Sequence, residues 1–283
     1  MADTFSSLPL KDIKDLPTLP SMASMAMAVA EDPSSTPSDL LRVIMTDPPT
    51  AARLLRVANS VHFNRGHEVS DLQTAIIRLG FANVRNLLMG VSVIRTFNAF
   101  FADAPYTRED FWFHCISVGT LASRMARADE RLSSSTGFVA GLLHDLGKLV
   151  LDRYLRDAFT HSLRLAEGER ISLHEAEKKR LGYDHAAVAG QLLGLWHFPA
   201  ELLEPIRWHH DPDACPESHR LHAVLIQLAD YLCNAHSIGY SGNPHPCRPL
   251  EKHLRALRFR DEMIDPLLKS LEGETLLAFL MPA

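Results

Sequence analysis

The sequence contains little of what marks secreted or membrane proteins. Its 283 residues include four cysteines, at positions 115, 215, 233 and 247, and no CxxC pair. This spacing argues against a disulfide framework or a thiolate zinc site and predicts free thiols in a reducing compartment. No run reaches the roughly 18 apolar residues that cross a bilayer, and the first residues lack the basic start and apolar core of a signal peptide. We therefore expect a cytoplasmic protein without a membrane-spanning segment.

A strong charge of either sign is also missing. The formal net charge is −5 and the pI is near 6.3, which is not the basic excess that general nucleic-acid binding requires. Hydrophobic residues make up 46% and charged residues 22% of the chain, as in ordinary globular proteins with a core of useful size. We expect neither nucleic acid nor a membrane as a partner.

Strand signals are scarce too. The chain contains no Asn-Gly or Asp-Gly hairpin dipeptide, and apolar and polar residues rarely alternate. Helical periodicity recurs instead: Ser38 is expected to cap one helix, and Ser70 and Gly80 to bound another. The run TGFVAGLLHDLGKLVLDRYL predicts a single helix over residues 136–155. The sequence therefore predicts an all-α protein.

A polar joint that contains a proline, ADAPYTRED at residues 102–110, divides the chain. We predict an N-terminal helical subdomain over 13–101 and a second helical subdomain over 102–239. A C-terminal loop and helical tail are predicted over 240–283, with a loop rich in proline and glycine at 240–253 and a short helix near 261–280.

The most unusual feature is the high number of histidines, 15 in all. This excess is informative because histidine is the commonest metal ligand. His144 and Asp145 lie side by side in an apolar run that is typical of a buried helix. An unpaired buried carboxylate costs several kcal/mol unless a cation or hydrogen bonds compensate for it. A bound divalent metal would compensate for it.

Other polar residues lie in similar apolar segments. Taken singly, a histidine at a helix end is more often a surface or satisfied core residue, and an aspartate in an apolar helix more often caps or pairs with a basic residue. Their joint occurrence predicts a metal site made of His114, His144, Asp145, His185, His209, His210 and Asp230. Mixed nitrogen and oxygen ligands favour Fe or Mn, with Zn, Co, Ni or Mg as alternatives. Seven ligands exceed what one tetrahedral ion needs, so we expect two divalent ions with one carboxylate bridging them.

The run LLHDLGKL at residues 142–149 resembles the signature helix of the HD superfamily of metal-dependent phosphohydrolases. The order of the expected ligands is similar to that of its HD-GYP branch. The resemblance implies that metal ions activate water, that Asp145 bridges them, and that Lys148 stabilises phosphate charge, which makes Asp145 and Lys148 the expected catalytic residues. The chain reads HHDPDACPESHRLH at residues 209–222, without the Gly-Tyr-Pro segment that would support cyclic-di-GMP hydrolysis.

The N-terminal half resembles the HDOD domain, an HD-related output domain of bacterial signalling proteins. The resemblance rests on LPTLP at residues 16–20, LLRVANS at 54–60 and AIIRLG at 75–80, and it extends over roughly residues 13–235. It implies an HD-superfamily helical bundle, in which these N-terminal motifs serve the fold. The remaining histidines are expected at surface or packing positions: His62, His67, His161, His174, His197, His219, His222, His236, His245 and His253.

Three functions remain open at this point. The HDOD resemblance favours a bacterial signal-transduction or regulatory protein that binds a signalling partner or a nucleotide and retains a dinuclear metal site. The complete ligand set favours a metal-dependent phosphohydrolase or phosphodiesterase acting on a nucleotide or another phosphate ester. A metal site that is only structural, or that senses iron or oxygen, is the third reading. The sequence does not identify the substrate, the metal, the partner protein, the oligomeric state or the role of residues 240–283.

Overall fold

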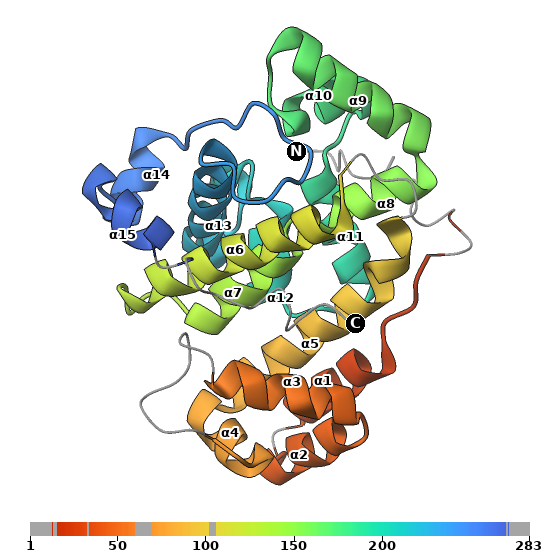
Figure 1. The fold of residues 1–283 in the computed structure, drawn as a ribbon, viewed down its shortest axis with the longest axis vertical. Helices are drawn as coiled ribbons and strands as arrows, with labels where there is room; N and C mark the ends of the chain where they lie inside the picture. Colours follow the sequence, from red (N-terminus) through yellow and green to blue (C-terminus); the bar gives the residue numbers. More distant parts are fainter. Residues whose placement is uncertain are drawn as a thin grey trace. The chain divides into compact units, whose positions relative to one another are not determined.

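The fold is that of a computed structural model, which describes residues 13, 16–32, 34–59, 69–101, 106–269 and 271 (Figure 1). Every regular element in these residues is a helix, so the all-α prediction is confirmed. The chain forms two compact units, with residues 18–98 in the first and the described residues from 99 onward in the second. The division predicted at residue 102 falls on residues outside the described part. Within the described residues, no single helix is both long and apolar enough to cross a membrane, and only the helix pair Leu72–Leu79 and Phe81–Phe97, bent by 108° at the junction, meets that test together.

The first unit contains five helices. They are α1 (Ser21–Glu31), α2 (Pro37–Met45), α3 (Pro48–Asn59), α4 (Leu72–Leu79) and α5 (Phe81–Phe97). The long helix α5 packs on α1, and the apolar faces of α2 and α4 meet through buried residues such as Leu40, Ile44 and Ile76.

Two helix starts differ from the predicted ones. The cap of α2 is Thr36, whose side chain forms a capping box with Asp39, because Pro37 occupies the first helical position. The cap of α4 is Asp71, whose carboxylate accepts from the backbone N–H of Thr74 at 2.7 Å. Gly80 ends α4 with a φ of 85°, as expected.

The second unit begins with the helices that carry most of the polar core. They are α6 (Arg108–Arg127), α7 (Ser134–Leu143), α8 (Leu146–Tyr154), α9 (Arg156–Glu169), α10 (Leu173–Leu181), α11 (His185–Leu195), α12 (Ala200–Arg207) and α13 (Glu217–Ala235). The helices α6 and α7 approach so closely that a Cβ on Gly141 would lie 2.6 Å from the Cα of Gly119. The helix α13 packs on α6, and α11 packs on α8.

The helix predicted over residues 136–155 is wrong, because the chain breaks at the His-Asp pair. The helix α7 ends at Leu143, and α8 begins at Leu146. Asp145 has φ −91° and ψ 4°, outside the helical region. The break allows both side chains to point into the interior, where His144 is 0% and Asp145 is 1% exposed.

The C-terminal part is also more structured than the predicted loop. After α13 the chain runs without regular structure to α14 (Glu251–Ala256), which begins inside the predicted loop. The predicted tail helix consists of a short 3-10 turn, η4 (Asp261–Met263), and α15 (Ile264–Lys269). Residues after 271 lie outside the described part of the chain.

Candidate metal centre

The structure brings all seven predicted ligands to one place inside the second unit. They come from α6, from the break between α7 and α8, from the start of α11, from the turn after α12, and from α13. Six of them are buried, and His210 is half-buried. Their donor atoms form two groups with one carboxylate between them.

The first group consists of His114, His144 and Asp230. The Oδ1 of Asp230 lies 3.1 Å from the Nε2 of His114 and 3.4 Å from the Nε2 of His144. The Oδ2 of Asp145 faces the same group, 3.3 Å from His144 Nε2 and 3.7 Å from His114 Nε2.

The second group consists of His185, His209 and His210. The Nε2 atoms of His185 and His210 lie 2.8 Å apart, and the Nε2 of His209 is buried without a hydrogen-bond partner among the described residues. The other oxygen of Asp145, Oδ1, lies 3.3 Å from His185 Nε2. Asp145 therefore presents one carboxylate oxygen to each group.

The outer ring nitrogens fix how the imidazoles are oriented. The Nδ1 of His144 donates to the carbonyl of Gly141 at 2.7 Å, and the Nδ1 of His209 donates to the carbonyl of Ile206 at 2.8 Å. The Nδ1 of His114 faces the carbonyl of Ile238 at 3.3 Å. Because a carbonyl only accepts, each Nδ1 carries a proton, which leaves Nε2 as the ring atom that could bind an ion. This is the tautomer that binds a metal through Nε2.

The spacing of the inward atoms fits metal coordination. Donor atoms about 2.1 Å from one ion lie roughly 3.0 Å apart at a right angle and roughly 3.4 Å apart at the tetrahedral angle. Five of the six donor pairs described above are separated by 2.8–3.4 Å, and the sixth, His114 Nε2 to Asp145 Oδ2, by 3.7 Å. The Nε2 of His144 is buried without a hydrogen-bond partner among the described residues, 3.3 Å from Asp145 Oδ2. The spacing of these donors therefore fits the binding of a divalent ion.

The protonation states without an ion follow from burial and charge. Burial acts to lower the pKa of His144, but the charges of Asp145 and Asp230 raise it to about 10. Burial also opposes the charge of His185, whose pKa is raised to about 9 by Glu177 and Asp145. Burial and the two neighbouring imidazolium rings lower the pKa of His209 to about 3. The two protonated rings thus offset negative charge of the neighbouring carboxylates, a role that a bound cation could take over.

The side chain of Lys148 is buried beside the centre and bound to two neighbours. It is 2% exposed, and its Nζ donates to Asp145 Oδ2 at 2.7 Å and to Ser241 Oγ at 3.1 Å. Burial opposes its charge, but Asp145 raises the pKa of Lys148. In this arrangement the lysine holds the Asp145 carboxylate in place and favours its ionised form.

Several residues beside the centre were not predicted from the sequence. Glu177 is fully buried and accepts from the backbone N–H and the Nδ1 of His185, at 2.8 Å and 2.6 Å. His174 stacks on His210 with ring centroids 4.1 Å apart, and His253 is 5% exposed, so both occupy packing positions beside the centre. Cys115 lies beside His144 and Asp145, but burial raises the pKa of its thiol and keeps it protonated. His62 and His67 lie outside the described residues.

Replacing Glu177 with glutamine tests its support of the centre. The Glu177→Gln side chain keeps the shape but loses the charge that orients His185, and loss of such an outer partner typically weakens metal binding about 10–100-fold. We expect that loss in a competition assay with a chromogenic chelator. Glu217→Gln, at an exposed position of α13, is the control, and equal affinities for both variants would contradict the role of Glu177.

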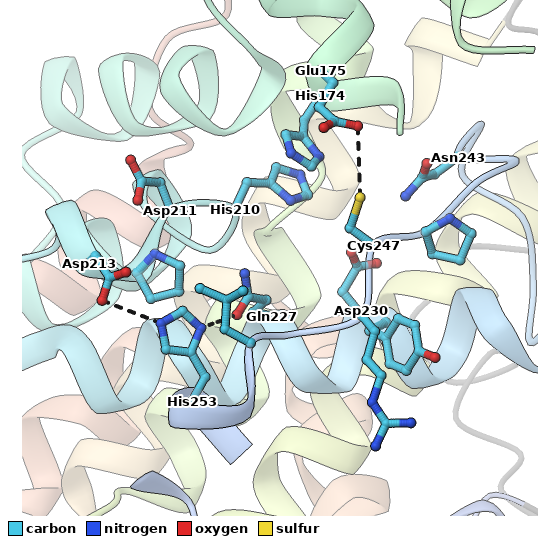
Figure 2. A pocket seen from close by; sticks show the side chains of 15 residues that line it. His174, Glu175, His210, Asp211, Asp213, Gln227, Asp230, Asn243, Cys247 and His253 are labelled. Carbon is cyan, nitrogen blue, oxygen red and sulfur yellow. Dashed lines mark hydrogen bonds and ion pairs between the residues drawn. The ribbon is translucent and has the colours of Figure 1, made fainter. Parts of the chain in front are cut away.

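A pocket of ≈ 230 Å³ adjoins the two groups (Figure 2). It is lined by Asp230 of the first group and His210 of the second. A molecule in this pocket would therefore contact a ligand from each group.

The sequence matches the description of one protein family. The model of the HDOD domain matches residues 16–212. A crystal structure of an HDOD domain protein of unknown function from Geobacter sulfurreducens has the same fold, with a TM-score of 0.77, 22% identity, and coverage of 97% of this chain and 96% of that chain.

Two further similarities concern proteins with described roles. A candidate signal transduction protein from Marinobacter aquaeolei is 26% identical, with a TM-score of 0.73 and coverage of 96% of this chain and 61% of that chain. Ribonuclease Y of Thermus thermophilus is 34% identical over 122 residues, which are 43% of this chain and 16% of that protein. An uncharacterized protein of Treponema pallidum is 26% identical over 192 residues, which are 67% of this chain and 36% of that protein. The chain therefore spans 36% or less of the length of the two curated relatives described.

Proposed function

The chain belongs to the HDOD domain family, and on that basis we propose that it is a signal-transduction protein whose second helical unit holds two divalent metal ions. The regulatory part rests on the family and on the similarity to the signal transduction protein of Marinobacter. The metal part rests on the geometry of the candidate centre.

The observation that carries the proposal is the position of Asp145 between two groups of three ligands. One group would hold an ion through His114, His144 and Asp230, and the other through His185, His209 and His210. The ring nitrogens that face away from the centre are held by backbone carbonyls and by Glu177. The rings are therefore oriented before an ion arrives, which lowers the ordering cost of binding.

A second function, hydrolysis of a phosphate ester, is favoured by the pocket beside the two groups. Bound divalent ions would polarise a phosphoryl oxygen and activate water. In this chain Asp230 and His210 expose the centre to the pocket, and Lys148 keeps Asp145 ionised. The relative named ribonuclease Y adds support for phosphodiester chemistry.

Metal content tests the proposal directly. We expect about two equivalents of Fe or Mn per chain in protein purified anaerobically without added metal, measured by elemental analysis. His185→Ala removes one ligand and should lower the content to about one or less, whereas His161→Ala, an exposed histidine in α9, should leave it unchanged. A folded protein that contains essentially no metal after incubation with Mn²⁺ would refute the metal centre.

A further inference from the structure

The pocket beside the metal ligands has walls from different parts of the chain. The side formed by Asp230 and His210 belongs to the metal centre. Another side is formed by the segment Asn243–His253, which begins well after residue 212, where the family match ends. Lining residues from this segment are Asn243, Pro246, Cys247, Arg248, Leu250 and His253. Figure 2 shows Cys247 and Asn243 across the pocket from Asp211 and Asp213.

This segment is held in place at both ends. The side-chain oxygen of Asn243 accepts from the buried backbone N–H of Leu173 at 3.1 Å, and the ring of His253 donates to Gln227 Oε1 at 2.9 Å. Just before the segment, Ser241 contacts Lys148. A wall fixed in this way selects ligands by shape and hydrogen bonding, because little ordering energy is lost on binding.

Two of the lining acids, Glu175 and Asp213, make contacts with other side chains. Glu175 accepts from Ser172, the cap of α10, at 2.6 Å, and Asp213 pairs with Lys252 and His253. Because the oxygens of Gln227 and Asn243 are already bonded, their amide N–H groups are the donors that these two side chains can offer a ligand. Such donors can bind oxygen acceptors of a small polar molecule, hydroxyl groups included.

The size of the pocket limits the ligand. Its ≈ 230 Å³ is below the roughly 300–1,000 Å³ of pockets for drug-sized molecules. A dinucleotide exceeds this space, whereas a single phosphorylated sugar-sized molecule does not.

We propose that the segment Asn243–His253 determines ligand specificity at the centre, and that the pocket takes a small phosphomonoester of a polyhydroxy alcohol. The phosphate faces Asp230 and His210, and the hydroxyl-bearing part contacts Gln227 and Asn243. This assignment rests on the proposed metal centre, since the ions would bind the phosphate.

Titration calorimetry on the full Mn-loaded chain, with inorganic phosphate and ribose 5-phosphate as probes, tests the assignment. We expect ribose 5-phosphate to bind at least about tenfold more tightly than phosphate, and Gln227→Ala to weaken the sugar phosphate about tenfold while phosphate binding is unchanged, as loss of one to two hydrogen bonds implies. Ser218→Ala, at an exposed position of α13, is the matched control and should behave as the wild type.

A second variant separates loss of ligand binding from a folding defect caused by Gln227→Ala. Cys247→Trp places a large ring in the pocket from an exposed position and should abolish binding of ribose 5-phosphate with metal content and melting temperature retained. If the wild type binds the two probes with equal affinity, or if neither variant changes binding of the sugar phosphate, the proposed role of residues 243–253 in ligand specificity is overturned. The proposed metal centre is not affected by that outcome. A wild-type chain that retains no Mn overturns the proposed metal centre and this assignment with it.

Discussion

Asp145→Ala is expected to remove both metal ions. Asp145 is the one ligand that faces both groups, with Oδ2 toward His144 and Oδ1 toward His185. Its loss leaves each group with three donors and no shared charge, so we expect the metal content to fall from about two equivalents to near zero. Elemental analysis after anaerobic purification measures this, with Asp157→Ala, an exposed carboxylate in α9, as the control.

The same substitution also leaves Lys148 without its partner. Removing one member of a buried ion pair typically costs about 3–5 kcal/mol, so a fall in metal content could follow from unfolding alone. The double variant Asp145→Ala with Lys148→Met removes the unpaired charge and should recover most of the stability in chemical denaturation, yet still bind no metal. Metal content at the wild-type level in a folded Asp145→Ala protein would exclude Asp145 as a ligand.

Gly147→Ala is expected to destabilise the fold strongly. A Cβ at this position would lie 1.9 Å from the backbone oxygen of His185 and 2.9 Å from the backbone N of Ala189. Both contacts are with the backbone of α11, which cannot rotate away, so α8 and α11 must separate. Overpacking typically costs about 1–3 kcal/mol, and we expect the upper end of this range, with a melting temperature roughly 6–12 °C lower.

The matched control is Gly168→Ala in α9. A Cβ at Gly168 meets no atom within 4 Å, so this variant gains helix propensity and should be more stable by about 0.5–1 kcal/mol. Because α11 begins at His185, separation of α8 and α11 should also weaken metal binding in Gly147→Ala. Equal melting temperatures for the two glycine variants would show that the close approach of α8 and α11 is not required.

The membership of the candidate ligand set can be inferred from the sequence. His114, Asp145 and Asp230 each stand in an apolar segment, so their burial and the need for compensation follow from local composition. The helical class follows in the same way, because helical periodicity and capping are properties of short stretches. The distances between the donor atoms of these residues could not be inferred from local composition, because the segments lie as many as 116 positions apart, as for His114 and Asp230.

The outer contacts of the centre, by contrast, depend on how the helices pack. Glu177 lies in LHEAEKKRL, which reads as a charged surface helix, and its burial arises from packing against His185. The helix break at His144 and Asp145 interrupts a continuous apolar run, so no local sequence signal predicts the break. The break occurs where both side chains turn inward to face donor atoms from other helices. The segment Asn243–His253 has the composition of a loop, and its place at the pocket depends on contacts with α10 and α13. Local sequence thus sets the chemistry of the donor atoms, and long-range packing sets their geometry, because distances between segments depend on contacts that no single segment encodes.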